Sequence, residues 1–189
     1  MARIENTEVR FMSKSLKASR YPMAVELGDL SDDLTERQLK LANAPSGSGH
    51  DNFLKGIVVE FDLTLSIKAW VQAERYHFLE FVSSQSTMHR IARMDVRKSC
   101  NKYVTADAIA NVEGLKDEYN RTHSPEDYLR LLYNIPTGFE ITAGMVTNYS
   151  QLKTIYNQRR CHRLPDWQMF CDWIETLPNS QLITGKAQL

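Results

Sequence analysis

The sequence predicts an α+β protein in which helices pack on a central, mostly antiparallel sheet, as a single domain over residues 1–189. Three observations support this prediction. Residues 57–68 alternate between apolar and polar side chains, which is typical of a long, half-buried strand, and residues 139–147 alternate in the same way. The segments around them have helical spacing in mixed order, without a regular βαβ cycle. The length is that of about one domain of ordinary size.

The segment after the first strand is expected to be a helix from Ala69 to about Ser83. Val71, Phe78 and Val82 form one apolar stripe, and a second stripe makes the helix apolar nearly all round. Such a helix belongs inside a molecule or in a contact between subunits, where polar side chains need partners. The polar side chains that need partners here are Gln72, Glu74, Arg75, His77 and Glu80.

The other elements follow from capping residues, prolines and spacing. A small-residue loop around His50 precedes the first strand, and Asn148 is an N-cap signal directly after the second. We expect helices over 34–41, 105–119 and 125–135, a helix starting after Asn148, and a last helix from Pro165 that ends before Pro178.

Composition excludes several classes of protein. Lys and Arg total 23 and Asp and Glu total 23, so no positive surplus favours a nucleic-acid partner. The three cysteines form no CxxC pair and the five histidines form no HExxH motif, so we expect a reducing compartment and no metal. The first 30 residues are charged and no uncharged run approaches about 18 residues, which predicts a cytoplasmic protein without a membrane contact.

Two arginine positions are candidates for chemistry. Arg75 lies on the apolar stripe, where a permanent charge requires a carboxylate of the same chain, such as Glu74 or Glu80, or else a ligand or a second chain. The cluster from Arg159 to Arg163 suits a phosphate, because arginine binds phosphate in a bidentate manner. Cations at a helix C-terminus also offset the helix dipole, which is the alternative interpretation. The loop around His50 is either a ligand loop or only a connection.

In chain order, these segments resemble the flavin-dependent thymidylate synthases over residues 47 to 175. The family's helix motif Gln-x-x-Arg-His-Arg is similar to Gln72-Ala73-Glu74-Arg75-Tyr76-His77, and its later Ser-x-Arg is similar to the run that contains Gln85, Ser86 and Arg90. The family then has a Leu-Pro pair and a strand, to which Ile135-Pro136 and residues 139–147 are similar. Its Asn-x-x-x-Leu motif is similar to Asn148 to Leu152, and its Leu-Arg pair to Gln158-Arg159. Its aromatic helix is similar to Asp166 to Phe170. The short, diverged chain is similar to members that phages encode.

The chain differs from the family pattern at four positions that the family uses. Tyr76 replaces a histidine, His77 an arginine and Glu80 a serine. Leu132 stands where the family has an arginine before the late proline, and Arg130 lies two positions earlier.

The resemblance implies an α+β fold of this family and synthesis of dTMP from dUMP, with FAD as cofactor and methylenetetrahydrofolate and NADPH as co-substrates. It also implies a homotetramer with sites between subunits. The implied catalytic residues are Ser86, Arg90 and Arg159, of which Arg159 and Arg90 are expected to hold the phosphate of the nucleotide. The implied nucleotide-binding residues are Gln72, Gln85, Ser86, Arg90, Arg130, Arg159 and Arg160, and the implied flavin-binding residues are His50, Arg75, His77 and Asn148.

Two alternatives keep the fold. One is a pyrimidine-modifying enzyme with another acceptor or one-carbon product, in which Glu80 and His77 exchange protons. The other is a nucleotide-binding or assembly protein that lacks flavin and catalysis.

Overall fold

The centre of the molecule is an antiparallel sheet of four strands. We describe it from a computed structural model, which covers residues 2–45 and 47–186. The spatial order is β1-β2-β4-β3, and every neighbouring pair is antiparallel. The strands are β1 (Arg3–Arg10), β2 (Val58–Ser66), β3 (Glu80–Ser84) and β4 (Glu140–Asn148). The predicted α+β class with an antiparallel sheet is therefore confirmed.

The two predicted strands, β2 and β4, pair at the centre of the sheet. Their register runs from Val58 opposite Asn148 to Ser66 opposite Glu140. Alternation places one apolar row of each strand on the same face, where Leu63 and Met145 are buried. This pairing brings the start of α3, which follows β2, beside the start of β4.

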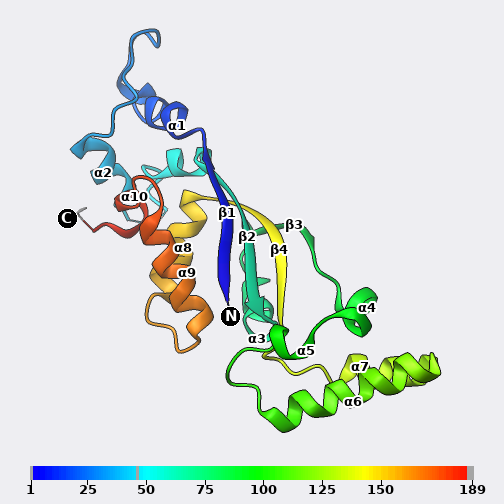
Figure 1. The fold of residues 1–189 in the computed structure, drawn as a ribbon. Coiled ribbons are helices and arrows are strands. Elements are labelled where there is room, and N and C mark those ends of the chain that lie inside the picture. Colours follow the sequence, from blue (N-terminus) through cyan, green and yellow to red (C-terminus); the bar gives the residue numbers. More distant parts are fainter. Residues whose placement is uncertain (1, 46, 187–189) are drawn as a thin grey trace.

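Helices from the C-terminal third cover the apolar face of the sheet (Figure 1). Trp167, Phe170 and Ile174 are fully buried there, and Phe170 lies edge-on to Phe61 of β2 with ring centroids 6.2 Å apart. The helices are α8 (Tyr149–Arg159), α9 (Pro165–Thr176) and the short α10 (Gln181–Thr184), with α2 (Glu36–Ala42) beside α10.

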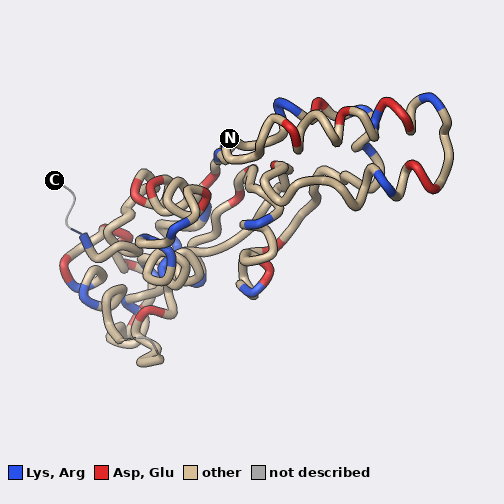
Figure 2. The backbone as a smooth tube through the Cα atoms, turned by 90° about the horizontal axis from the view of Figure 1, so that it is seen from below, with Lys and Arg blue, Asp and Glu red and all other residues tan. Residues whose placement is uncertain are grey.

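A helical hairpin projects from one end of the sheet, as Figures 1 and 2 show from two directions. It consists of α6 (Ala106–Thr122) and α7 (Pro125–Tyr133), and Ser124 caps α7 as predicted. The hairpin contributes Ile109, Val112 and Leu131 to a second apolar cluster, which it shares with Ile91, Val96 and Phe139 outside the hairpin.

Short elements connect these parts. They are α1 (Met12–Ala18), α4 (Thr87–Arg90), α5 (Val96–Ser99) and three 3₁₀ turns over Tyr21–Met23, Asn52–Gly56 and Ile91–Arg93. Within the residues that the structure describes, no helix has the length and apolar character needed to span a bilayer.

The predicted helix over 69–83 is wrong in its second half. Helix α3 (Ile67–Ala73) ends early, and residues 80–84 form β3, which pairs with β4. The Phe81-Val82 segment suits a strand as well as a helix, and pairing with β4 decides between them. The stripe was expected either inside the molecule or in a contact between subunits, and the first alternative is wrong: Val71, Phe78 and Val82 are 65%, 62% and 72% exposed in this chain.

Candidate functional site

Arg159, the last residue of α8, is a buried arginine without an acidic partner. Only 7% of the residue is exposed to solvent. Nε donates a hydrogen bond to the Tyr76 hydroxyl at 2.7 Å, and Nη1 donates to Gln72 Oε1 at 3.1 Å. The guanidinium also lies over the Trp167 ring, 4.7 Å from its centroid. No carboxylate within residues 2–45 and 47–186 forms an ion pair with it.

The neighbours of Arg159 fix the orientation of one amide. Gln72 Oε1 accepts from Arg159 and also from Trp167 Nε1, at 3.0 Å. Because both donors meet the oxygen, the Gln72 amide nitrogen remains as a donor. The Tyr76 hydroxyl in turn donates to Gln158 Oε1 at 3.0 Å. We call Gln72, Tyr76, Gln158, Arg159 and Trp167 the Arg159 cluster.

The Arg159 cluster is positively charged and rich in donors. Tyr76, Gln72 and Gln158 are neutral, so their hydrogen bonds hold the guanidinium without neutralising it. A buried cation is costly unless an opposite charge or a strongly polarised acceptor faces it. The arrangement therefore suits an anionic ligand, or one that gains negative charge during a reaction.

The sequence grouped Gln72 and Arg159 as nucleotide-binding residues, and the structure brings their side chains into contact. It did not assign roles to Tyr76 and Trp167. In the sequence, Tyr76 is a departure from a family motif, and Trp167 lies in the aromatic helix of the resemblance. The sequence does contain a signal for their roles: the Trp167 N–H and the Tyr76 hydroxyl lie within apolar patterns, and such groups need hydrogen-bond partners when they are buried.

Arg75 and His77 lie beside a shallow cavity of about 230 Å³ that is also lined by Phe78, Gln151 and Thr154. Arg75 forms no ion pair with any acid that the structure describes, so the pairing with Glu74 or Glu80 is absent. Its guanidinium instead lies 5.7 Å from the centroid of the Tyr76 ring.

A polar cavity of about 510 Å³ separates the small-residue loop from α8. Gly49, Lys55 and Asn157 line it, and it shares Thr154 and Gln158 with the Arg75 cavity, so the two adjoin along α8. Gly47 and Gly49 have φ of 87° and 77°, a backbone conformation that favours glycine.

The loop is fastened to α8 by an ion pair. Lys153 Nζ lies 2.9 Å from Asp51 Oδ2, and both side chains are largely buried. His50 is exposed on the same loop, between two residues that line the cavity, Gly49 and Asp51. Asn148 accepts the backbone N–H of Gln151 at 2.9 Å and caps α8, as predicted from the sequence.

The side chains of four other predicted residues are not hydrogen-bonded to the Arg159 cluster within the described part of this chain. Gln85 Oε1 accepts the Thr142 N–H at 2.9 Å, Ser86 precedes α4, and Arg90 is exposed at its end. Arg160 is exposed with its guanidinium 6.0 Å from the Tyr156 ring centroid.

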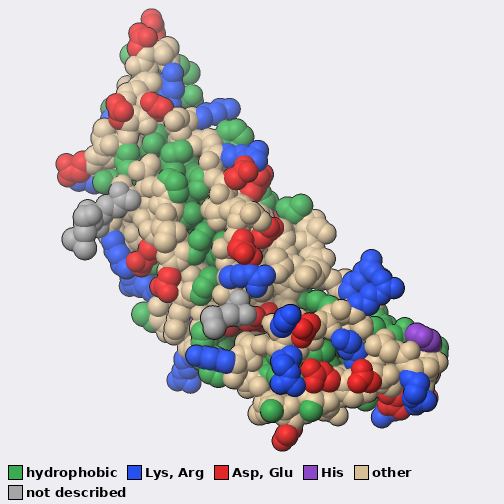
Figure 3. Space-filling view, in the orientation of Figure 1, with side chains coloured by type: hydrophobic (Ala, Val, Ile, Leu, Met, Phe, Trp, Pro, Cys, Tyr) green, Lys and Arg blue, Asp and Glu red, His purple; other side chains and the backbone are tan. Residues whose placement is uncertain are grey.

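Arg130 is engaged on the hairpin. Its guanidinium lies 3.3 Å from Glu118 and 3.4 Å from Asp127. Figure 3 shows acidic and basic side chains interspersed over this hairpin, at the lower right. The place that the family gives to an arginine before the late proline is taken by Leu132, which is half-buried. A phosphate contact from this segment would require Arg130 to leave its two acids.

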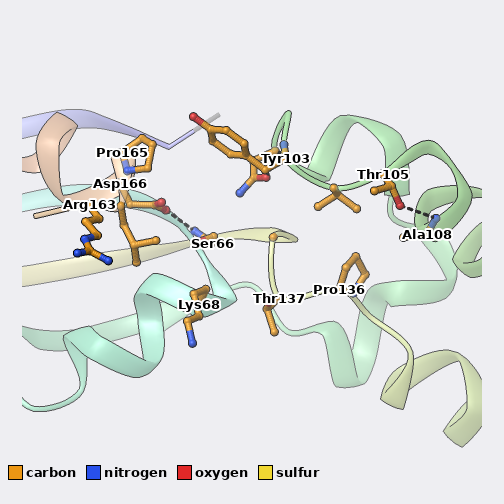
Figure 4. A pocket seen from close by; sticks show the side chains of 14 residues that line it. Ser66, Lys68, Tyr103, Thr105, Ala108, Pro136, Thr137, Arg163, Pro165 and Asp166 are labelled. Carbon is orange, nitrogen blue, oxygen red and sulfur yellow. Dashed lines mark hydrogen bonds between the residues drawn. The ribbon is translucent and has the colours of Figure 1, made fainter.

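A further cavity of about 610 Å³ lies where the sheet meets the hairpin (Figure 4). Lys68 of α3 and Arg163 of the α8–α9 loop line it, and Tyr103 precedes α6 across the cavity. The Asp166 carboxylate, which is buried, accepts the Ser66 backbone N–H at 3.0 Å. No motif in the sequence indicates this cavity.

His162 provides a pH-dependent contact next to Arg159. Its Nδ1 accepts the Leu164 N–H at 3.1 Å, which requires a neutral ring nitrogen. Burial and the nearby Arg159 charge lower the pKa of His162 below its usual 6.5. As pH falls, the unfolded chain therefore binds a proton at His162 before the folded chain does. The contribution of neutral His162 to the free energy of unfolding is present above about pH 6.5 and is lost as pH falls through the folded pKa.

We expect the free energy of unfolding of the wild type to fall more steeply below about pH 6.5 than that of His162→Asn. Urea titrations at several pH values between about 5 and 7.5 measure this difference. The carboxylates are common to both proteins, so their effects cancel in the comparison. Identical declines in the two proteins would contradict the assignment to His162.

Two other chemistries find little support. Burial raises the pKa of the Cys171 thiol to about 12, which disfavours a nucleophilic thiolate there. Across residues 2–45 and 47–186, no three His, Cys, Asp or Glu side chains gather as a metal site would require.

Comparison with known proteins reveals a likeness in structure only. No family model and no curated protein sequence matches the chain. Two solved structures of thymidylate synthase ThyX from Helicobacter pylori, both with FAD and dUMP, superpose with TM-scores of 0.74 and 0.76. Their sequences are 14% and 13% identical to this chain. The superpositions include 96% and 97% of this chain, and 97% of each ThyX chain.

A third similar structure is the UMP/dUMP methylase PolB from Streptomyces cacaoi, bound with 5-Br dUMP. Its TM-score is 0.63 at 15% identity, over 98% of this chain and 95% of PolB. The chain therefore has the fold of these proteins over nearly its whole length, which confirms the expected ThyX-like fold.

Proposed function

We propose that this chain binds a deoxyuridine monophosphate at the Arg159 cluster and transfers a one-carbon unit to its pyrimidine ring. In full, the proposed reaction is synthesis of dTMP from dUMP, with FAD as cofactor and methylenetetrahydrofolate and NADPH as co-substrates. The observation that carries the proposal is the buried guanidinium of Arg159, which only neutral groups of the described chain contact. Both similar ThyX structures contain FAD and dUMP.

The Arg159 cluster can recognise a pyrimidine through defined atoms. The free amide N–H groups of Gln72 suit a ring carbonyl oxygen, because the Gln72 oxygen already accepts two hydrogen bonds. The fixed positive charge of Arg159 stabilises negative charge that develops on the ring during one-carbon transfer. Tyr76 and Trp167 keep the guanidinium in place before the ligand arrives, so no reorganisation is needed.

The residues along α8 fit a flavin. The 510 Å³ cavity offers side-chain amides, the Lys55 ammonium and a glycine loop that permits close backbone approach, all suited to a diphosphate and its sugars. The adjoining cavity offers the Arg75 guanidinium, the His77 imidazole and the rings of Tyr76 and Phe78. A bound flavin supplies the hydride chemistry, and these residues bind and orient it. His50 and Asn148 contribute by shaping the loop and the start of α8.

A homotetramer completes the proposed site. Val71, Phe78 and Val82 are exposed apolar residues, of which Phe78 lines the cavity at Arg75, and a second copy would bury them. Ser86, Gln85 and Arg90 lie on an exposed segment of the same region, from which they would reach the nucleotide of a neighbouring copy. Ser86 and Arg90 are then catalytic together with Arg159, and Gln85, Arg130 and Arg160 have secondary binding roles.

A different acceptor is the second candidate function. PolB, which shares the fold, is described as a UMP/dUMP methylase, so UMP is an acceptor to compare with dUMP. His77 and Glu80 are exposed near the proposed flavin site and are the residues to replace if the product differs from dTMP.

An absorption spectrum of the purified protein, before and after incubation with FAD and re-purification, tests the proposal. We expect a bound, oxidised flavin spectrum that changes when dUMP is added, and a tetramer by light scattering. Addition of UMP in parallel identifies the preferred acceptor. A protein that retains no flavin would contradict the synthase function, and binding of dUMP without flavin would support the non-catalytic alternative.

A further inference from the structure

We propose that Lys68 and Arg163 form the phosphate subsite of the nucleotide, in the 610 Å³ cavity next to the Arg159 cluster. This inference rests on the proposed function and assigns two residues to it. Arg163 ends the Arg159–Arg163 cluster that the sequence predicted to suit a phosphate, whereas Lys68 belongs to no predicted motif.

The position of the two cations relative to the Arg159 cluster carries the argument. Lys68 is four residues before Gln72 on α3, so both lie on one side of this helix, one turn or about 5.4 Å apart. Arg163 follows Arg159 by four residues, in the loop where α8 has ended, and lines the same cavity as Lys68. The pair Lys68 and Arg163 therefore adjoins the contacting pair Gln72 and Arg159.

This spacing suits a nucleoside monophosphate. The sugar separates the base from the phosphate by roughly one helical turn. A pyrimidine at Gln72 and Arg159 would then direct its phosphate toward Lys68 and Arg163. The cavity volume of about 610 Å³ is within the range of small-ligand sites.

The charges of the cavity favour an anion. Lys68 and Arg163 are exposed, and neither forms an ion pair with an acid within the described part of the chain. Asp166 is the one carboxylate among the lining residues, and it is buried against the Ser66 N–H. Two cations thus stand against one carboxylate, and arginine adds bidentate geometry for a phosphate.

The walls of the cavity suit the rest of such a ligand. Figure 4 shows Lys68 and Arg163 on one side of the cavity and Tyr103 on the other. Pro136 and Pro165 provide apolar surface for a sugar, and Tyr103 has an exposed ring. The position also explains how the chain functions without an arginine at 132, because two other cations supply the charge.

Calorimetric binding of dUMP and of deoxyuridine, which lacks the phosphate, tests the assignment. We expect Lys68→Met and Arg163→Gln each to weaken dUMP binding about tenfold, since each removes a charge-assisted hydrogen bond, and to leave deoxyuridine binding unchanged. The affinity ratio of dUMP to deoxyuridine should also fall less with added salt in the double variant than in the wild type.

Lys14→Met is the matched control, because Lys14 is an exposed lysine of α1 that does not line the cavity. Thermal unfolding of all variants verifies folding, which replacement of two exposed side chains should preserve. Wild-type affinity for dUMP in the double variant, or equal losses for dUMP and deoxyuridine, would overturn the phosphate subsite while the proposed function stands. Failure of the wild type to bind either ligand would overturn both.

Discussion

Replacement of Arg159 with alanine is expected to weaken dUMP binding by about 100-fold or more, which is about 3 kcal/mol. The substitution removes a buried cation and leaves two acceptors, the Tyr76 hydroxyl and Gln72 Oε1, each with one donor fewer. It also frees the Gln72 amide to rotate, because Trp167 alone then holds its oxygen. Deoxyuridine binding should fall in parallel, since Arg159 acts on the base, unlike the cations of the phosphate subsite.

Calorimetry with both ligands measures this effect, and two variants serve as controls. Arg159→Lys keeps the charge but loses the planar donor geometry, so it should recover only part of the affinity. Arg37→Ala removes an exposed arginine of α2, outside the lining of every cavity discussed, and should bind like the wild type. Near wild-type binding by Arg159→Ala would show that this guanidinium has only a packing role.

Replacement of Trp167 with alanine is expected to destabilise the fold by about 3–5 kcal/mol. The ring is fully buried and packs edge-on against Tyr76 and Phe170, with centroid distances of 5.9 and 5.8 Å. Its loss would leave a cavity under the Arg159 guanidinium. Urea titration measures the change in free energy of unfolding.

The variant Trp167→Phe separates packing from hydrogen bonding at this position. It retains an aromatic ring but lacks the N–H that meets Gln72 Oε1, so its stability cost should be about 1 kcal/mol. Because the Gln72 amide loses one of its two anchors, dUMP binding should weaken more than stability alone accounts for. Equal stability losses in the alanine and phenylalanine variants would contradict the packing role of the ring.

Much of the fold could be predicted because the relevant signals are local. Alternation identified β2 and β4, and the side chains of Asn148 and Ser124 cap α8 and α7 where the sequence predicted. The order of the strands depends on pairings distant in sequence, and β1 gave no apolar alternation because it is an exposed, charged edge strand. The end of α3 was missed for a similar reason, since pairing with β4 overrides local spacing.

The candidate site was only partly predictable for the same physical reason. Gln72 and Arg159 were grouped through a family resemblance, and their contact spans 87 residues of sequence. Lys68 and Arg163 were not grouped, because their cavity is enclosed by four segments that only the folded chain brings together. The roles of Ser86 and Arg90 stay predictions, since no contact among the described residues links them to the Arg159 cluster.

The second apolar cluster, which joins the α6–α7 hairpin to residues outside it, links ligand binding to local unfolding. Asn101 and Tyr103, which precede the hairpin, form one wall of the phosphate cavity, and Ser66 and Asp166 of the main body form another. Because this cluster is distinct from the one under the sheet, the hairpin can undock in a local opening that breaks the second cluster and costs less than global unfolding. The cavity exists only while the hairpin is docked, so a nucleotide that fills it must also favour the docked state, and the hairpin in turn sets part of the nucleotide's affinity.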